Sequence, residues 1–252
     1  VKKVAYINIR LEIVFMALPK LGYPTFELEL PSTGKTVKYR PFLVKEEKVL
    51  LMALEAKDEK QVITGVKDLI KNCVISRIKV DQLPSFDLEY LFLKIRAASI
   101  GEVITLNVTC LDDNKTEVEV QININDVEVL KQEEHDPKIM FENNTGIIMK
   151  YPSMKQFIDR EFLQKDMKTE EVYDFIADSI DQIFDEDEVY DSTTTTKKEF
   201  RTFVDSLTTK QFEKIQQFYE TCPKLSHTFT ALNPNTGKES EYTIEGLQSF
   251  FA

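Results

Sequence analysis

Glycine and histidine are scarce in this chain of 252 residues, which contains seven glycines and two histidines. So few glycines argue against the nucleotide-binding folds whose phosphate loops depend on repeated glycine turns. His135 and His227 are the only imidazoles, and neither a Gly-x-Ser-x-Gly sequence nor a Cys-His signature is present. We therefore expect no catalytic residue and no enzymatic activity.

Cysteine is rare as well. Cys73, Cys110 and Cys222 lie far apart in the sequence, without a Cys-x-x-Cys pair. This pattern favours a reducing cytosol in which each thiol is a small buried side chain. Structural zinc needs four ligands, usually in close pairs, and Cys110, Cys222 and His227 form only incomplete pairs near predicted hairpins. We expect no metal and no other cofactor; retained zinc at these hairpins is the alternative left open.

The sequence has neither an excess of basic residues nor a long apolar run. Its 43 acidic and 32 basic side chains give a formal net charge of -11, so no cationic surplus is available for phosphates and nucleic acid is not expected as a partner. No stretch approaches the roughly 20 apolar residues that a membrane helix needs. Residues 1–15 resemble a signal peptide, but Asn8, Arg10 and Glu12 interrupt them. We expect neither membrane insertion nor secretion.

Met16 has the character of a natural start, which makes residues 1–15 an N-terminal extension. The alternative is a genuine edge strand over Val4–Phe15, where β-branched and aromatic residues are frequent. Removal of residues 1–15 without effect on folding or binding supports the extension, whereas a large drop in melting temperature supports the strand.

Four segments are predicted to form β-hairpins, because each places a cluster of Asn, Asp, Gly or Pro between two strand-like stretches. The predicted pairs are Thr25–Leu30 with Thr36–Arg40, Val103–Cys110 with Thr116–Ile124, Lys138–Phe141 with Ile147–Lys150, and His227–Leu232 with Glu239–Ile244. Apolar and polar residues alternate from Glu117 to Ile124, which indicates one buried and one solvated face.

Helices are expected between and after these hairpins. The segments before residue 150 are Val44–Glu55, Glu59–Asn72 and Phe86–Ala98; the last is apolar nearly all round and should be a buried central helix. After Tyr151-Pro152 the apolar spacing becomes mainly helical, with capping-box spacing at Ser153 and Gln156 and at Thr208 and Gln211. The helical stripes are Val172, Phe175, Ile176, Ile180 and Ile183, and then Phe212, Ile215, Phe218 and Tyr219.

These patterns predict an α+β protein with several β-hairpins, packed helices and a mainly helical C-terminal part. We place a boundary near residue 150. It separates a β-hairpin-rich α+β domain (16–150) from a mainly helical domain (151–252) that ends in a β-hairpin and a short terminal helix.

Negative charge is concentrated in one segment. Eleven acidic residues lie between Asp166 and Asp191, against Lys168 alone. The run from Asp185 to Glu188 is expected to end the acidic helix that carries the apolar stripe from Val172 to Ile183. It should then lead into a mobile loop at 192–196. This segment is either a solvated face or a docking surface for a basic partner.

Two stretches of sequence carry a family resemblance. The first runs from Met16-Ala17-Leu18-Pro19-Lys20-Leu21 through Leu30-Pro31-Ser32-Thr33-Gly34-Lys35 to Tyr39-Arg40-Pro41-Phe42-Leu43-Val44-Lys45-Glu46-Glu47-Lys48 and Leu50-Leu51-Met52-Ala53. The second is Asn233-Pro234-Asn235-Thr236-Gly237 with Glu245-Gly246-Leu247 and Phe250-Phe251. Together they resemble the baseplate hub subunit family of T-even-type contractile-tail phages, especially its marine and cyanobacterial relatives. The resemblance extends from Met16 to the end of the chain.

The resemblance implies a non-enzymatic viral protein at the centre of the tail baseplate of the virion, made and assembled in the host cytoplasm. Its partners would be other baseplate hub and tail proteins. The alternative is a transient assembly factor, or chaperone, that is absent from the mature virion. The family offers no catalytic motif, so none is assigned.

Six residues are candidates for partner binding, because aromatic and Arg side chains dominate most interfaces. They are Tyr39, Arg40, Pro41 and Phe42 in the most family-like segment, and Phe250 and Phe251 at the C-terminus. Internal packing that sets the hairpin-to-helix junction is the alternative for the first four. Docking against the chain's own core is the alternative for the last two.

Overall fold

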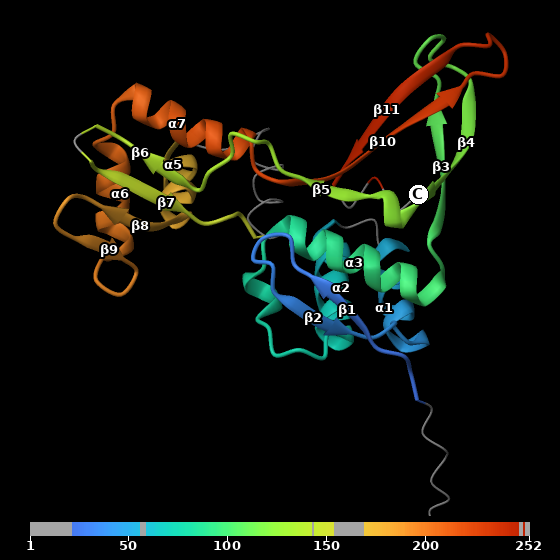
Figure 1. Ribbon diagram of the computed structural model, residues 1–252, viewed down its shortest axis with the longest axis horizontal. Coiled ribbons are helices and arrows are strands. Elements are labelled where there is room, and N and C mark those ends of the chain that lie inside the picture. Colours follow the sequence, from blue (N-terminus) through green and yellow to red (C-terminus); the bar gives the residue numbers. More distant parts are fainter. Residues whose placement is uncertain (1–21, 56–58, 143, 154–168, 247–248, 250–252) are drawn as a thin grey trace, which may run out of the picture.

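A computed structural model describes residues 22–55, 59–142, 144–153, 169–246 and 249. The N-terminal extension, the Ser153–Gln156 cap, and Phe250 and Phe251 lie wholly or partly outside these residues. Within them the buried side chains form two separate hydrophobic cores, and we call the corresponding parts the larger and the smaller lobe (Figure 1). The fold is mixed α+β.

All four expected hairpins form as antiparallel pairs. They are β1 (Phe26–Glu29) with β2 (Thr36–Tyr39), β3 (Val103–Thr109) with β4 (Glu117–Asn123), β6 (Lys138–Met140) with β7 (Gly146–Met149), and β10 (Lys224–Leu232) with β11 (Glu239–Glu245). Gly34 and Gly237 supply positive φ angles of 66° and 71° in two of the turns, which is the conformation that favours glycine there.

Three helices and a short 3-10 turn build the base of the larger lobe. They are α1 (Val44–Glu55), α2 (Glu59–Cys73), η1 (Val80–Gln82) and α3 (Ser85–Ile100). The prediction of a buried central helix is confirmed, since Leu88, Leu91, Leu93 and Ile95 of α3 are each at most 1 % exposed. Gly65 of α2 faces Ala53 of α1 so closely that an added Cβ would lie 3.3 Å from the Ala53 methyl group, and this glycine lets the two helices approach.

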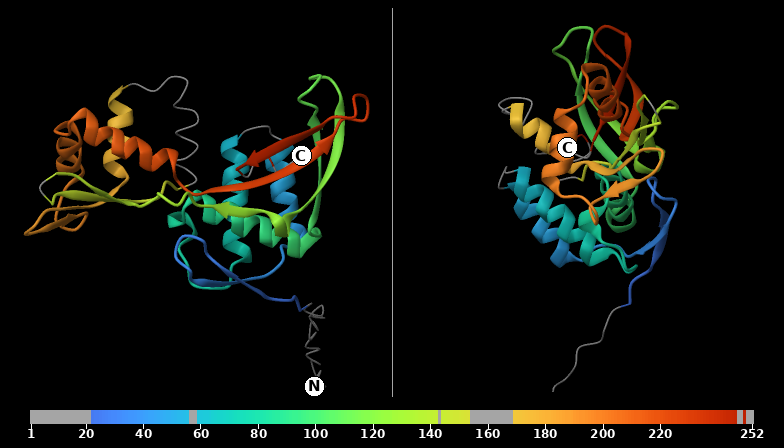
Figure 2. Two further views of the ribbon diagram at one scale, coloured as in Figure 1. Left: turned by 45° about the horizontal axis from the view of Figure 1, so that its top comes forward. Right: turned by 90° about the vertical axis from the view of Figure 1, so that its left-hand side faces the viewer.

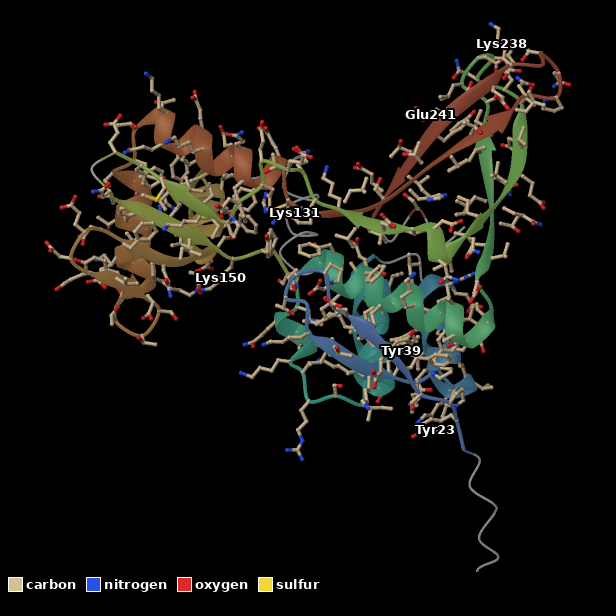
Figure 3. All side chains as sticks on the ribbon, in the orientation of Figure 1. Tyr23, Tyr39, Lys131, Lys150, Lys238 and Glu241 are labelled. Carbon is tan, nitrogen blue, oxygen red and sulfur yellow. The ribbon has the colours of Figure 1, made fainter. Side chains whose placement is uncertain are left out.

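An arm of two hairpins completes the larger lobe. The β3–β4 and β10–β11 hairpins lie side by side and project beyond the helices (Figures 1 and 2). At its base β10 also pairs with β5 (Glu128–Leu130), which follows the turn η2 (Ile124–Asp126). Lys238 is at the far end of the arm and Glu241 is on its flank (Figure 3).

The smaller lobe lies between β5 and β10 in the sequence. Its four-stranded sheet has the order β6-β7-β8-β9, with β8 at Ile180–Phe184 and β9 at Val189–Asp191. The described helices of this lobe are α5 (Thr169–Asp178), α6 (Lys197–Asp205) and α7 (Thr209–Glu220). Residue 150, where the sequence predicts a boundary, directly follows β7.

An aromatic stack joins the two lobes. His135 is 4 % exposed and stacks on Tyr151 and Phe218, with ring centroids 5.5 and 5.2 Å away. Tyr151 in turn meets Phe86 of α3 edge-on at 5.2 Å, and the Ser85 N–H donates to the Pro152 carbonyl at 3.1 Å. The stack spans the point where the chain leaves the larger lobe and returns to it.

The prediction of a mainly helical C-terminal part is wrong. Four strands, β8 to β11, lie after residue 151 beside α5, α6 and α7. The apolar stripe predicted as one helix is divided between α5 and β8, because the helix ends at Asp178 and the Ser179 hydroxyl donates to the Phe175 carbonyl.

A register irregularity explains the misleading helical spacing. Residues three apart in a regular strand face opposite sides of the sheet, yet Ile180 and Ile183 are both buried. Ile180 pairs with Met149 whereas Gln182 pairs with Ile148, so Asp181 is an extra residue in β8. Such a bulge returns both isoleucines to the core side. The run from Asp185 to Glu188, expected to end a helix, is instead the turn between β8 and β9.

Candidate interaction surfaces

The predicted cluster at Arg40 is packed inside the larger lobe. The Arg40 guanidinium is held by the Glu46 carboxylate at 3.1 Å and donates to the carbonyls of Pro41 and Asn72 at 2.8 and 2.9 Å. Arg40 is 7 % exposed and Glu46 4 %. The buried pair therefore fixes the junction between β2, α1 and the end of α2.

Arg40 and Glu46 each stabilise the charged form of the other. Burial by itself would raise the pKa of the Glu46 carboxyl, but the Arg40 guanidinium and the Leu43 N–H at 2.7 Å hold that pKa below its ordinary value. Burial raises the pKa of the neighbouring Cys73 thiol to about 11, so this cysteine is a buried thiol rather than a reactive thiolate.

The other members of the cluster are also mostly enclosed. Tyr39 and Phe42 belong to the core of the larger lobe, at 6 and 9 % exposure, and Pro41 is half-buried. Tyr23 covers the Arg40 guanidinium with its ring, 5.2 Å from the centroid. The geometry matches the internal-packing interpretation of these residues. Phe250 and Phe251 lie outside the described residues.

Helix α1 presents an exposed apolar face on the side away from the core. Val44, Leu51 and Met52 are 79, 53 and 59 % exposed, and with Lys48 they occupy positions i, i+4, i+7 and i+8 of the helix, which share one face. Leu50 and Ala53 point to the core instead. This face was not predicted from the sequence. The number of apolar residues in α1 indicates it, because they exceed what a single buried face of the helix can hold.

The two hairpins of the arm are locked together at their tips. The Asp112 carboxylate accepts hydrogen bonds from Asn233 Nδ2 at 2.8 Å and from the Thr236 hydroxyl. These bonds lower the pKa of Asp112. Asn235 Nδ2 donates to the Thr116 hydroxyl at 2.9 Å, which adds a further cross-link. The arm is therefore one unit, whose end exposes Leu111 and Leu232.

Four of the ten described acidic residues of the 166–191 segment form the following ion pairs within the smaller lobe. Arg201 contacts Glu170 and Asp174 at 2.6 Å each, Lys197 contacts Asp178 at 2.6 Å, and Lys150 contacts Asp181 at 3.3 Å. Among the described residues, no Lys or Arg forms an ion pair with Asp185, Glu186, Asp187 or Glu188. The unneutralised charge is thus concentrated in the β8–β9 turn.

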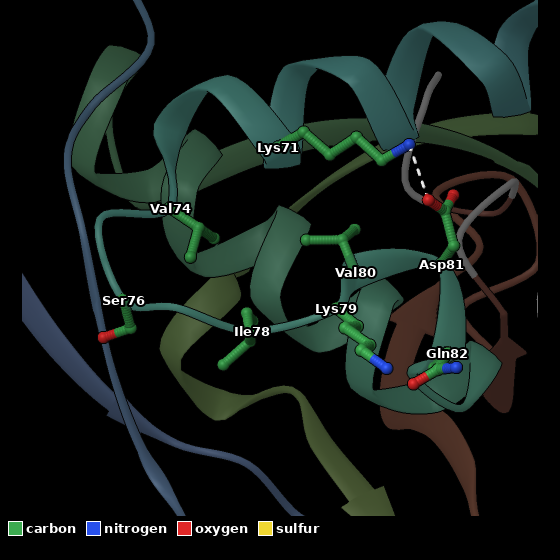
Figure 4. Close-up of a pocket in the computed structure, with 8 residues that line it drawn as sticks. All are labelled: Lys71, Val74, Ser76, Ile78, Lys79, Val80, Asp81 and Gln82. Atoms are coloured by element: carbon green, nitrogen blue, oxygen red, sulfur yellow. Dashed lines mark ion pairs between the residues drawn. The ribbon is translucent and has the colours of Figure 1, made fainter.

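A cleft of about 350 Å³ opens beside the end of α2 (Figure 4). Its lining comes from three consecutive parts of the chain: the last turn of α2, the loop after it, and η1. The residues are Lys71, Val74, Ser76, Ile78, Lys79, Val80, Asp81 and Gln82. Sequence reasoning missed this cleft, because the chain does not indicate that η1 folds back against α2.

The described residues offer little for metal or membrane chemistry. Within 22–55, 59–142, 144–153, 169–246 and 249, no three His, Cys, Asp or Glu side chains are placed to hold a metal ion. Cys110 and Cys222 are free thiols, and His227 Nδ1 is 3.2 Å from the Asp126 carbonyl. In the same part of the chain, no helix combines the length and apolar character that a membrane crossing requires.

Comparison with known proteins identifies a family. The sequence profile of the family described as "T4 bacteriophage base plate protein" matches residues 23–252, which include both lobes and the arm. No curated protein and no solved structure matches the chain.

Proposed function

The chain belongs to the family of the T4 bacteriophage base plate protein, and from this premise we propose that it is a non-enzymatic component of the baseplate hub that acts through contacts with other hub and tail proteins. The family assignment itself makes it a phage baseplate protein, located in the tail baseplate of the virion. The hub position and the assembly in the host cytoplasm are the further parts of the proposal.

The observation that carries the proposal is the exposed face of α1. A helix that leaves Val44, Leu51 and Met52 in water, on a junction stiffened by a buried ion pair, has the geometry of a docking surface. Lys45 and Lys48 border this face, so its occupant is an apolar segment of another baseplate protein with acidic residues at its rim. Phe250 and Phe251 remain proposed partner contacts.

A second candidate function is a transient assembly factor that escorts hub subunits and is absent from the mature virion. The β8–β9 turn favours it, since four adjacent acidic side chains lack a described cationic partner and suit a basic client. Quantitative mass spectrometry of purified virions and of infected-cell lysate separates the two functions. A fixed low copy number in virions indicates a structural subunit; abundance in lysate with absence from virions indicates the assembly factor.

The docking role of α1 is tested with phage that carry Val44→Asp and Met52→Asp together. We expect an at least tenfold drop in virion copy number, because two carboxylates in an apolar contact oppose docking, with the melting temperature of the purified protein unchanged. Leu111→Asp, a similarly exposed position on the arm, is the matched control. Normal incorporation of the α1 variant would exclude this face.

A further inference from the structure

We propose that the cleft beside α2 binds the acidic β8–β9 turn of a second copy of this chain, so that copies join head to tail. The contact uses two different surfaces of each copy, one in the larger lobe and one in the smaller lobe. It adds self-association to the proposed function and does not depend on it.

The cleft combines apolar side chains with basic ones (Figure 4). Val74, Ile78 and Val80 supply apolar lining, and Lys71 and Lys79 lie at its sides. At about 350 Å³, the cleft is at the lower limit of small-ligand pockets. It is roomy enough for one branched aliphatic side chain with flanking carboxylates.

Positive charge at the cleft exceeds what its own carboxylate neutralises. Asp81 contacts both Lys67 and Lys71, at 2.8 Å each, so one carboxylate serves two ammonium groups. Lys79 in the cleft and exposed Arg77 beside it form no ion pair with a described residue. An acidic segment is therefore the ligand that this site would attract.

The β8–β9 turn has the complementary chemistry. Asp185, Glu186, Asp187 and Glu188 are followed by Val189, which is 56 % exposed. Asp185 Oδ1 accepts the N–H groups of Asp187 and Glu188 at 2.9 and 2.8 Å. The turn is thus already ordered, and binding costs less conformational entropy than the capture of a flexible peptide.

The charge balance of the two parts makes a second copy the fitting partner. Residues 22–100 contain 13 basic and 11 acidic side chains, whereas residues 138–222 contain 11 basic and 18 acidic ones. Although the whole chain is strongly negative, the base of one copy and the smaller lobe of the next attract each other. A contact between unlike surfaces continues from copy to copy, as a closed ring or an open filament.

Charge reversal in the full chain tests the proposal, with sedimentation velocity as the readout over a wide concentration range. The wild type should associate with increasing concentration and dissociate with added salt. Lys71→Glu with Lys79→Glu, and separately Asp187→Lys with Glu188→Lys, should each weaken association at least tenfold. Lys79→Glu alone is the variant that leaves the Asp81 ion pairs intact, and circular dichroism melting checks folding.

Mixing the two variants gives the decisive result. One variant retains an intact turn and the other an intact cleft, so the equimolar mixture should regain association through that pairing, with a one-to-one dimer as its smallest complex. The reversed cleft and the reversed turn are again opposite in charge and add a second contact to larger complexes. The matched controls Lys35→Glu in the β1–β2 turn and Lys210→Glu on α7, both at exposed positions, should associate as the wild type does.

Three results would overturn the proposal. They are a wild type that stays monomeric at every concentration, a mixture that fails to form dimers, and a compact monomer that expands on charge reversal. The last would indicate that the turn and the cleft meet within one copy.

Discussion

At the scale of single residues, the buried Arg40–Glu46 pair is a contact of the larger lobe that does not tolerate the loss of one partner. Removal of one partner of a buried ion pair leaves an uncompensated charge in the protein interior. The resulting loss of stability is much larger than the net stabilisation that the intact pair provides. Both side chains are almost fully enclosed, so neither can turn to water when its partner is lost.

We predict that Arg40→Ala lowers the free energy of unfolding by about 3–5 kcal/mol, because Glu46 remains buried and unpaired. Chemical denaturation measures this change, and Arg77→Ala, at an exposed arginine, is the control with an effect within about 0.5 kcal/mol. A near-normal stability with loss of partner binding would instead make Arg40 an interface residue.

His135 gives the aromatic junction a pH dependence. Its Nδ1 is 2.9 Å from the Thr221 hydroxyl, which donates to the Gln217 carbonyl, so Nδ1–H is the donor to Thr221. Nε2 is buried and has no hydrogen-bond partner among the described residues. Burial, and then the nearby Lys131 ammonium, lower the pKa of His135 despite the opposing Asp136 carboxylate.

The sign of the pH effect follows from that lowered pKa. In the unfolded chain His135 binds a proton near pH 6.5, whereas in the folded chain it does so only at lower pH. The contribution of neutral His135 to the free energy of unfolding is therefore fully present above about pH 7 and is lost as the pH falls through 6.5. We predict that His135→Phe flattens the slope of unfolding free energy between about pH 5.5 and 7. The control His227→Gln should leave this slope unchanged. An unchanged slope in His135→Phe would contradict the assignment of the pH dependence to His135.

At the scale of elements, the arm depends on contacts between the loops of two hairpins far apart in the sequence. A single two-stranded hairpin is marginally stable in water. The Asp112 carboxylate, with its bonds to Asn233 and Thr236, joins the two tips.

We predict that Asp112→Ala loosens the arm locally without unfolding the protein. Amide hydrogen exchange at residues 107–118 and 230–240 should become about tenfold faster, while exchange in α3 and the melting temperature stay the same. Asp113→Ala is the neighbouring comparison. Because Asp113 bonds mainly within its own loop, to Lys115 and Thr116, with a smaller contribution from Asn233, it should affect chiefly the β3–β4 tip. Exchange rates in Asp112→Ala that stay at the wild-type values in both hairpins would argue against this contact between the tips.

At the scale of the whole molecule, the smaller lobe leaves and rejoins the larger lobe at neighbouring points. Leu130 of β5 is the direct partner of Lys224 of β10. Antiparallel partners have Cα atoms only about 4.5–5.5 Å apart, which a two-residue turn can connect.

We predict that replacement of residues 131–223 by Asn-Gly leaves a folded larger lobe, since this dipeptide favours a tight hairpin turn. The excised chain should unfold cooperatively, with some loss of stability from exposed Phe86. The boundary near residue 150 predicts instead that residues 16–150 fold alone, without β10 and β11. Comparison of the two fragments by hydrogen exchange decides between these divisions.

Local chemistry was sufficient to predict many of the elements. The four hairpins followed from their turn residues, and the capping box of Thr208 and Gln211 is present at the start of α7. The Arg40 cluster was singled out from its residue types, but its burial depends on Asn72 and Cys73, which are 32 and 33 positions away. The partner of a side chain at such a separation cannot be deduced from local spacing.

The sequence by itself determined the turns, most helices, the α+β class and the family resemblance, because each depends on residues within a few positions of one another. Only the tertiary structure decided that the Ile180–Phe184 segment is a strand, since its bulge exists in relation to β7. It likewise decided which acidic side chains are neutralised, because Arg201, Lys197 and Lys150 reach them from other elements. Pairing across the fold, rather than local preference, determines where this protein is left with exposed charge and apolar surface.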